Sequence, residues 1–261
     1  MPEGDTVYQA ARRLDVALAG RVLTVCEMRV PAYAEVNLVN QRVEGVVSRG
    51  KHLLLRVGPR TIHSHLKMEG KWEVYPRGER WRHPSFHARI VLGTAENDIV
   101  GFLLGIAEVI PRERESDVVG HLGPDLLDPE WDENHSAEAV RRIRAHPNQP
   151  IAVALLDQRN LAGIGNVYAN ELCFLRGMLP NRPVRDSDVP ATVALARRLL
   201  WANRDRPVRV TTGMVGRGRT TWVYGRRGQL CRRCGTPLVH GALGRRSGEE
   251  RVIVFCPTCQ T

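Results

Sequence analysis

Apolar residues near the start of the chain recur at helical spacing. Between Asp5 and Leu18 they fall on one face of a helix, for which Thr6 or Asp5 is the expected cap and Gly20 the end. After residue 20 the pattern changes to short runs rich in β-branched residues and separated by glycines, which is typical of strands. We predict seven strands, which are Arg21–Val30, Arg42–Arg49, His52–Val57, Arg60–His65, Lys71–Tyr75, Ala88–Leu92 and Ile99–Ile110. This many short strands predicts a sandwich or barrel, with a polar loop at 76–87.

Helical spacing returns after His121. The predicted helices are Ser136–Ala145, Pro150–Gln158, Asn166–Leu175 and Ala191–Ala202. The second and third are joined by the turn Gly163-Ile164-Gly165, which gives a helix-turn-helix arrangement. Backbone N–H groups at Gly165 and a helix that begins at Asn166 could bind a phosphate. An ordinary helical hairpin explains the same spacing equally well.

The charge of the chain favours a polyanionic partner. The formal net charge is +10, and the stretch from Arg204 to Arg233 holds nine arginines against one acid, Asp205. The basic residues are 35 arginines and only three lysines, which are Lys51, Lys67 and Lys71. Lysine can release a proton when its surroundings lower its pKa, whereas arginine cannot, so each lysine is a candidate proton donor. Drift in base composition would also leave a few lysines behind.

No apolar run reaches the length of a membrane span, and the N-terminus has acids where a signal peptide has a basic region. We therefore expect a cytoplasmic protein. Cysteine spacing then gives the most specific local signal. Cys231-x2-Cys234 and Cys256-x2-Cys259 are separated by 21 residues, the spacing of a zinc ribbon with four thiolate ligands. Two disulfides would be unfavourable in a reducing cytosol.

The first residues offer a nucleophile. Removal of the initiator methionine would leave Pro2 with a free secondary amine, and an α-amine of ordinary pKa, about 8, is partly neutral near pH 7. A neutral amine attacks electrophilic carbon, as lysine does in Schiff-base enzymes. Glu3 places a carboxyl beside it for proton transfer. Taken alone, two residues carry little weight, and an uninformative start of the gene explains them as well.

Six motifs are spread over nearly the whole chain. They are MPEG at 1–4, RGKHLL at 49–54, HLGPDLL at 121–127, LLDQRNLAGIGNVYANE at 155–171, VYGRRG at 223–228 and CPTCQ at 256–260. Together they resemble the formamidopyrimidine-DNA glycosylase and endonuclease VIII family. The MPEG start favours the endonuclease VIII branch, in particular its second, actinobacterial Nei type.

The resemblance implies a multidomain α+β fold. It places a two-layered β-sandwich with an N-terminal helix at 1–122, a helix-two-turn-helix domain at 123–222 and a zinc finger at 223–261, with one structural Zn²⁺. It also implies a monomer that binds damaged DNA, double-stranded or in single-stranded or bubble form, and works at the nucleoid. The implied activity is a bifunctional glycosylase and AP lyase of base excision repair that excises oxidised pyrimidines. The alternatives are a glycosylase for oxidised purines and a non-catalytic protein that binds damaged DNA.

Individual roles carry over position by position. Pro2 matches the amine that attacks the sugar C1′, Glu3 the acid that protonates the sugar ring oxygen, and Lys51 the proton donor for β-elimination. Arg251 matches the finger arginine that assists δ-elimination, although Arg245 and Arg246 are rivals because the finger has an insertion near Gly241–Gly248. The expected DNA contacts are Gly165, Asn166, Lys67 and Met68, and the expected metal ligands are Cys231, Cys234, Cys256 and Cys259.

Two departures from the family bear on function. Thr6 stands where many members have a second glutamate, which puts auxiliary acid–base chemistry in doubt. The purine-specific branch fills the space left by the extruded base with a methionine plus an arginine and a phenylalanine from one later loop. Here Met68 is present, but the corresponding stretch, 111–117, has no phenylalanine. The base opposite the lesion would then lack a stacking partner worth about 1–3 kcal/mol.

The assignment of Pro2 predicts a covalent protein–DNA adduct that borohydride traps during turnover. Replacement of Pro2 by glycine is a weak test, because any terminal amine can react. A retained methionine or an N-terminal tag removes the amine from its place, and we expect both trapping and strand cleavage to be lost. Full activity of the blocked protein would contradict the assignment.

Overall fold

The apolar stripe at the start of the chain forms helix α1 (Gly4–Leu18) in the computed structural model, which describes residues 2–246 and 248–261. The N-cap of α1 is Glu3, so the expectation that Thr6 or Asp5 caps the helix is wrong. The Asp5 carboxylate instead accepts a hydrogen bond from the backbone N–H of Thr6, inside the first turn. The stripe itself is buried as predicted, through Val7, Ala10, Ala11, Leu14, Ala17 and Leu18.

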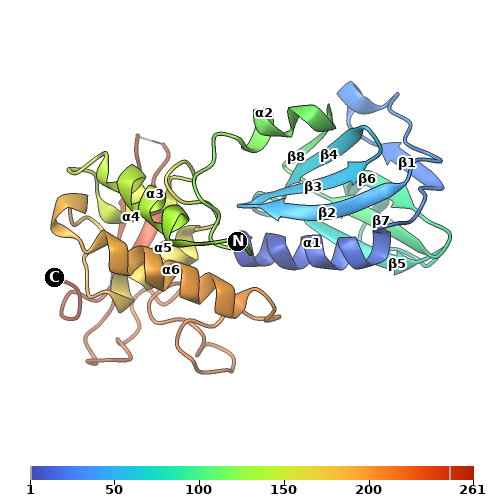
Figure 1. Cartoon of the computed structure of the whole chain (residues 1–261). Helices are drawn as coiled ribbons and strands as arrows, with labels where there is room; N and C mark the ends of the chain where they lie inside the picture. Colours follow the sequence, from blue (N-terminus) through green and yellow to red (C-terminus); the bar gives the residue numbers. More distant parts are fainter. Residues whose placement is uncertain (1, 247) are drawn as a thin grey trace. The chain divides into compact units, whose positions relative to one another are not determined.

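The chain folds into two units, Met1–His121 and Leu122–Thr261 (Figure 1). The first holds α1, one further short helix and two β-sheets, and the second holds the remaining α-helices and a C-terminal hairpin. The boundary at residue 223 between a helix-two-turn-helix domain and a zinc finger stays a prediction. Within the described ranges no helix combines the length and the apolar character needed to cross a membrane.

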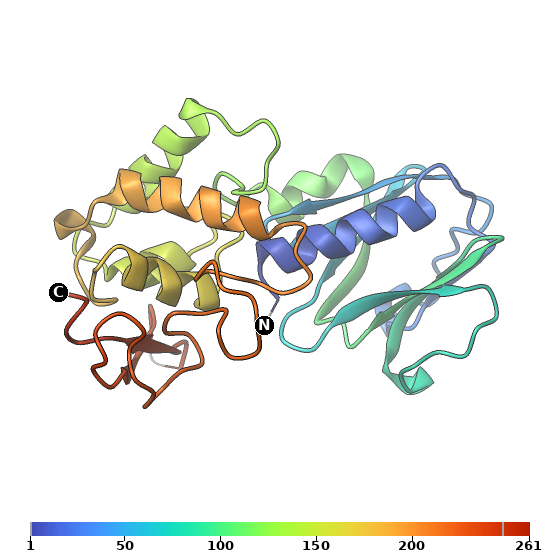
Figure 2. The same ribbon diagram turned by 90° about the horizontal axis from the view of Figure 1, so that it is seen from below.

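Both sheets of the first unit have four antiparallel strands. One has the order β2-β3-β4-β8 and the other the order β1-β6-β7-β5. The bounds are β1 Val25–Met28, β2 Val43–Arg49, β3 His52–Val57, β4 Arg60–His65, β5 Lys71–Pro76, β6 Ala88–Gly93, β7 Asn97–Phe102 and β8 Ile106–Pro111. The predicted sandwich is therefore confirmed, with α1 packed against one of its sides (Figure 2).

Polar contacts fix α1 and the two sheets to one another. Asp15 of α1 accepts a hydrogen bond from the backbone N–H of Val46, at 2.9 Å, and so satisfies a donor of the edge strand β2. The indole Nε1 of Trp72 on β5 donates to the Ser64 hydroxyl on β4, at 3.1 Å, and both side chains are buried. Around these contacts lies one apolar core to which α1 and both sheets contribute.

The single predicted strand Ile99–Ile110 is wrong, because this stretch forms β7 and β8 in different sheets. The chain turns between them at Leu103, whose φ of 49° lies in the left-handed region. Two backbone hydrogen bonds hold the turn: Leu103 N–H donates to His87 and Gly105 N–H donates to His65. Since Leu103 and Leu104 are themselves apolar, no polar residue marks the break in the sequence.

The second unit contains the four predicted helices, which are α3 (Glu133–Arg144), α4 (Ile151–Leu156), α5 (Asn166–Leu175) and α6 (Val189–Asn203). Helix α3 begins three residues earlier than predicted, because Asp132 and His135 form a capping box. A short helix that the pattern does not show, α2 (Glu115–Val119), ends the first unit. Its few residues carry no apolar stripe to predict it.

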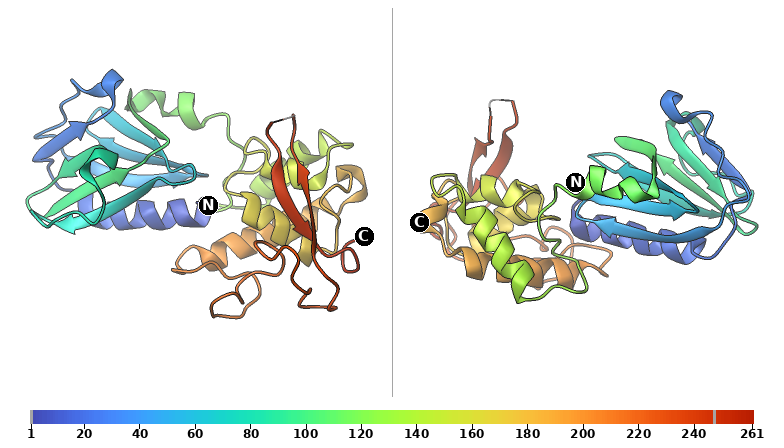
Figure 3. Two further views of the ribbon diagram at one scale, coloured as in Figure 1. Left: turned by 180° about the vertical axis from the view of Figure 1, so that it is seen from behind. Right: turned by 45° about the horizontal axis from the view of Figure 1, so that its top comes forward.

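A hairpin of β9 (Val239–Leu243) and β10 (Arg251–Phe255) closes the chain, in red in Figure 3. It is joined to α5 by the buried side chain of Asn170, whose Oδ1 accepts a hydrogen bond from the Val254 N–H at 2.6 Å. The amide of Gln260 donates to the Met178 carbonyl and accepts from the Cys256 N–H. The hairpin is thus tied to the helical part by buried hydrogen bonds.

A buried carboxylate organises the segment that precedes the hairpin. Glu171 on α5 is 0% exposed, and it accepts hydrogen bonds from the backbone N–H groups of Trp222, Val223 and Tyr224 at 2.8–2.9 Å. The hydroxyl of Thr211 donates to the same carboxylate. A buried charge with this many donors is well satisfied, and the loss of its charge would leave them poorly paired.

We predict that Glu171→Gln lowers the free energy of unfolding by about 3 kcal/mol, because the glutamine amide sets a donor against backbone donors. Urea unfolding followed by tryptophan fluorescence measures the change. Glu130→Gln is the matched control: Glu130 is exposed, and its substitution should change stability by less than about 0.5 kcal/mol. Equal stability of the two variants would contradict this role of Glu171.

Candidate active site and cysteine cluster

The two residues expected to begin the chemistry lie at the start of α1. Pro2 is partly exposed, whereas Glu3 is 0% exposed and its carbonyl accepts the first helical hydrogen bond, from Val7. The positive end of the helix dipole favours a carboxylate at this place. A second carboxyl, Asp5, is also buried here, and the Thr6 hydroxyl donates to it. The site that lacks the family's second glutamate therefore still contains two buried carboxyls.

Lys51 occupies the turn between β2 and β3. The ladder of these strands ends at the pair Arg49 and His52, and Gly50 takes a left-handed φ of 58° that permits the tight turn. In Figures 1 and 3 this turn lies at the same end of the unit as the start of α1. The turn that holds Lys51 therefore lies at the same end of the first unit as the start of α1.

Lys67 and Met68 follow β4, which ends opposite the start of β3. Lys67 has a φ of 54°, and its side chain lies flat against Gly105, where a Cβ would stand 2.1 Å from the Lys67 Cγ. The loop closes by a hydrogen bond from the Gly70 N–H to Leu66. Met68 lies in this loop and is 60% exposed.

Sequence reasoning missed a histidine cluster at the same end of the sheet. His52 Nδ1 lies 2.8 Å from His63 Nε2, and His63 Nδ1 lies 2.6 Å from Glu108 Oε1. The rings of His65 and His121 lie edge-on to His52, with centroids 5.1 and 6.1 Å away. One signal was available: His63 and His65 are two residues apart in a strand, so their side chains share a face.

Burial favours the neutral forms of His52 and His65. It lowers the pKa of His52 to about 3, with smaller contributions from the neighbouring histidines and Lys67. Burial also lowers the pKa of His65 to about 4, and Lys67 and Lys51 add to the effect. The Nδ1 of His65 accepts a hydrogen bond from the Lys67 N–H, so the proton of this neutral ring is on Nε2.

In the second unit, Gly165 is the N-cap of α5 and Asn166 is its first residue, as predicted. The Asn166 side chain is 7% exposed, and its Nδ2 donates to the Val252 carbonyl on β10 at 2.9 Å. Arg251 is the residue before Val252. The structure thus brings the helix-turn asparagine next to the predicted finger arginine, although they are 85 positions apart in the sequence.

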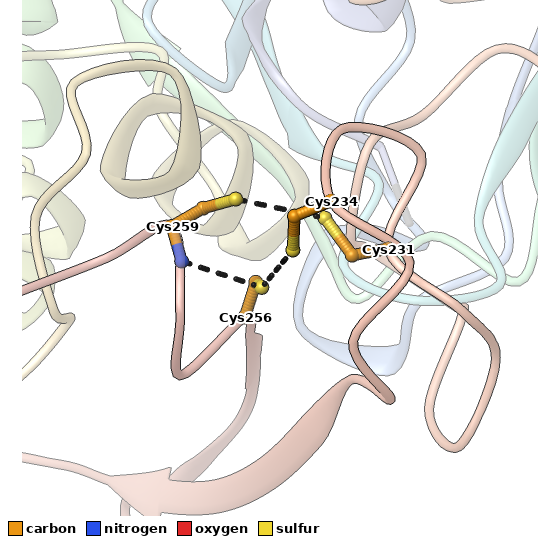
Figure 4. A group of neighbouring side chains, drawn as sticks. All are labelled: Cys231, Cys234, Cys256 and Cys259. Carbon is orange, nitrogen blue, oxygen red and sulfur yellow. Dashed lines mark hydrogen bonds between the residues drawn. The ribbon is translucent and has the colours of Figure 1, made fainter.

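The four cysteines of the two CxxC pairs come together (Figure 4). All four Sγ atoms lie within 4.8 Å of one another, with Cys231 and Cys259 3.9 Å apart and Cys234 and Cys256 3.4 Å apart. Four sulfurs at about 2.3 Å from a tetrahedral zinc would be roughly 3.8 Å apart, so the donor set and its spacing fit this metal. Cys26 and Cys173 lie elsewhere, and burial raises the pKa of Cys173 to about 12.

Comparison with known proteins places these features in one family. Residues 1–103 match the formamidopyrimidine-DNA glycosylase N-terminal domain, and residues 122–200 match the H2TH domain of the same enzymes. The chain belongs to the formamidopyrimidine-DNA glycosylase family. Within this family, it is similar to proteins named as endonuclease 8, which confirms the predicted branch.

Three relatives illustrate the likeness. A protein of Streptomyces coelicolor named "Probable endonuclease 8 2" is 52% identical over all of this chain and 94% of its own length. A protein of Mycolicibacterium smegmatis named "DNA-(apurinic or apyrimidinic site) lyase Nei2" is 50% identical over 100% of this chain and 99% of its own. "Endonuclease 8" of Escherichia coli is 31% identical over the full length of both chains.

Solved structures of the family share the fold. The Lactococcus lactis formamidopyrimidine-DNA glycosylase bound to DNA with an AP site has a TM-score of 0.77 and 21% identity, over 99% of each chain. A complex of "the LlFpg protein, a THF-DNA and an inhibitor" has a TM-score of 0.81 at the same identity, over 100% of each chain. At this identity the likeness concerns the fold.

Proposed function

We infer that this protein is a bifunctional DNA glycosylase and AP lyase of base excision repair. The observation that carries the inference is the start of α1, where Pro2, which becomes terminal if the initiator methionine is removed, stands beside a fully buried carboxyl, Glu3, at the same end of the unit as the β2–β3 turn that holds Lys51. Full-length relatives named as endonuclease 8 and as an AP lyase support it. A non-catalytic DNA-binding protein would not need these three groups at one end of the unit.

We propose the following roles in the reaction. The base must first leave the helical stack so that the sugar C1′ becomes accessible. The Pro2 amine attacks C1′ while Glu3 protonates the ring oxygen, and the base departs to leave an iminium. The iminium acidifies the C2′ proton, so that elimination breaks the 3′ phosphate bond. Lys51 supplies a proton to the departing phosphate, and a second elimination breaks the 5′ bond.

The DNA partner accounts for the charge of the chain. The net charge of +10 and the arginines between Arg204 and Arg233 suit phosphate contacts. Asn166 and Gly165 at the start of α5 are further proposed DNA contacts, since helix N-termini bind phosphate. A chromosomal substrate places the enzyme in the cytoplasm, at the nucleoid, and we propose that it acts there as a monomer.

Arg251 is the proposed finger arginine. Among residues 2–246 and 248–261, its exposed side chain has neither an ion-pair nor a hydrogen-bond partner, and Asn166 holds the adjoining residue in place. Arg245 is engaged differently, because it forms an ion pair with Asp157, at 3.0 Å, inside the unit. Burial alone would raise the pKa of Asp157, but hydrogen bonds from Arg159 and the charge of Arg245 lower it. Arg245 is thus committed to a structural pair.

We predict that Arg251→Ala slows δ-elimination roughly 10- to 100-fold, as expected for the loss of a charge-assisted hydrogen bond to phosphate. Denaturing gels that separate the β- and δ-elimination ends measure the effect. Arg245→Ala is the control and should leave the ratio of the two ends unchanged. If Arg245→Ala or Arg246→Ala has the δ-elimination defect instead, the assignment is wrong.

We propose that the four cysteines bind one structural Zn²⁺. The metal would supply the cross-link that orders this small hairpin, whose own apolar cluster contains few side chains. Two thiolates come from the segment before β9 and two from the segment after β10, so the ion would join both ends of the hairpin. Arg251 depends on this order for its position.

Metal analysis of the purified enzyme should find one zinc per chain. Removal of zinc by a chelator, or Cys234→Ser, should weaken DNA binding and δ-elimination while α1 and the sandwich stay folded, because the cluster lies wholly within the second unit. Circular dichroism and fluorescence report the fold of the remainder. Active protein without bound metal would overturn the proposal.

We propose oxidised pyrimidines as the substrate class. The segment that supplies a phenylalanine in the purine-specific branch is here η3 (Arg112–Arg114) and α2, and it is held against the sheet. Glu115 accepts hydrogen bonds from Arg56 and from the Thr61 hydroxyl, at 2.6–2.9 Å. Met68 therefore enters the vacated space without support from this segment, and the base opposite the lesion loses a stacking partner.

A panel of oligonucleotides with single lesions tests both activity and substrate class. We expect excision of 5-hydroxyuracil, dihydrouracil or thymine glycol with little dependence on the opposite base, in duplex and in bubble DNA. Efficient removal of 8-oxoguanine opposite cytosine, with pyrimidine lesions untouched, would identify the purine alternative. Binding without cleavage of any lesion or abasic site would identify the non-catalytic alternative.

A further inference from the structure

The outer face of the sheet β2-β3-β4-β8 carries a line of ionisable side chains. His63 on β4 is directly paired with Glu108 on β8, and His65 is paired with His52 on β3. Paired residues, and residues two apart in a strand, project to the same face. The opposite face holds the apolar core, with Leu53, Leu55 and Ile62. A histidine on the outer face is not needed for that core.

Three of these side chains form a continuous hydrogen-bonded chain. It runs from Glu108 Oε1 to His63 Nδ1 over 2.6 Å, and from His63 Nε2 to His52 Nδ1 over 2.8 Å. The rings of His52 and His63 are nearly parallel, with an interplanar angle of 16°. His63 is 2% exposed, so the middle of the chain is shielded from water.

The positions of the protons follow from the carboxylate. An ionised Glu108 only accepts, so His63 donates from Nδ1, and a neutral His63 must accept at Nε2. His52 then donates from Nδ1, which leaves an unprotonated Nε2 at the free end of the chain. The neighbouring ring of His65 is the opposite tautomer. Its Nδ1 accepts from the Lys67 N–H and its Nε2 carries the proton.

The charged and titratable groups around His52 explain why a proton would not stay on this ring and would pass on to His63. His65 and His63 on β4, His121 after α2, and Lys67 in the loop after β4 all disfavour a positive charge on the His52 ring, and burial does so most strongly. Lys51 precedes His52 and acts on His65. A positive charge on His52 is therefore unfavourable, and a proton taken up at Nε2 requires that the Nδ1 proton pass to His63. There the carboxylate of Glu108 can balance the charge.

We propose that Glu108, His63 and His52 form a proton relay that works with Lys51 in β-elimination, as the acceptor for the proton that leaves the sugar. The inference rests on the role proposed for Lys51, which supplies a proton to the phosphate but leaves the acceptor unassigned. His52 is the receiving end of the relay, and the sugar proton reaches it through a water, while Lys51 supplies a separate proton to the phosphate.

The transfers balance as follows. The C2′–H bond breaks and its electron pair forms the C2′=C3′ double bond, while the C3′–O bond breaks and its pair leaves with the 3′ phosphate. The proton arrives at His52 Nε2, and the Nδ1 proton of His52 moves to His63 Nε2. The resulting imidazolium of His63 stays paired with Glu108. The reverse transfer to solvent restores the relay after the product leaves.

Glu108→Gln is the main test, because it keeps the shape of the side chain and removes only its charge. In single-turnover assays on a preformed abasic site, we expect β-elimination to slow on the order of 10- to 100-fold. Borohydride trapping of the Pro2 adduct should proceed at the wild-type rate. The acid limb of the pH–rate profile should move to lower pH, since loss of the anion makes the relay harder to protonate.

The same sheet face offers a matched control. Glu115 also accepts hydrogen bonds from a cation and a polar side chain on this face, namely Arg56 and Thr61, but it belongs to the separate network described above. Glu115→Gln should reduce stability without a change in the elimination rate or its pH profile. Glu108→Asp should recover part of the rate, and added imidazole should accelerate elimination by His52→Ala.

The outcomes separate the relay from the proposed function. Loss of trapping in the unmodified enzyme would refute Pro2 catalysis, whatever the relay does. Normal trapping with an unchanged elimination rate and pH profile in Glu108→Gln would overturn the relay alone. Equal slowing of elimination in Glu108→Gln and Glu115→Gln, or no acceleration of His52→Ala by imidazole, would also overturn it, because a structural role predicts those results.

Discussion

The chemistry proposed for this protein depends on how firmly one helix is anchored. A nucleophile at the end of a chain would ordinarily move freely, since terminal residues are poorly ordered unless they are held. Here the second residue precedes α1, whose apolar stripe is buried against both sheets. Asp15 adds a hydrogen bond to the backbone of β2, the strand that leads into the Lys51 turn. The anchor of α1 therefore also joins the helix that follows Pro2 to the strand that precedes the Lys51 turn.

The second unit uses buried polar groups for the same purpose. Glu171 accepts hydrogen bonds from the segment between Thr211 and Tyr224. Asn166 and Asn170 form hydrogen bonds with the backbone of β10. All three side chains lie on α5, whose residues Asn166 to Phe174 are buried. Helix α5 thus acts as the common support for the arginine-rich segment and for the cysteine-bearing hairpin. Hydrogen bonds of this kind specify one arrangement, because an unpaired partner would be costly.

Much of this architecture is visible in the sequence, since periodicity shows which elements bury one face. The stripe of α1 and the alternating strands up to β6 follow from it. The pattern fails at Leu103, where apolar residues continue through a change of sheet and the chirality of one backbone dihedral decides the outcome. It also fails at α2, which is held by Glu115 rather than by apolar burial.

The residues of the candidate site also divide into those that the sequence predicts and those that only the fold reveals. Spacing sufficed for the cysteines, because two CxxC pairs restrict the possible geometries. Motifs led to Pro2, Glu3 and Lys51, whose roles no periodicity could give. The partnership of His63 with Glu108 joins residues 45 positions apart, and only the register of β4 with β8 reveals it. Long-range pairing of this kind is set by the fold and leaves no local trace in the sequence.

The scarcity of lysine has a practical side. Lys51, Lys67 and Lys71 are the only three lysines in the sequence, and they lie in the β2–β3 turn, the loop after β4 and the start of β5. Reagents that acylate amines would therefore modify the protein in this one neighbourhood and at the N-terminus, and nowhere in the second unit. Mass spectrometry of such labelling, with and without a bound ligand, would act as a footprint of the catalytic end, read from a handful of peptides.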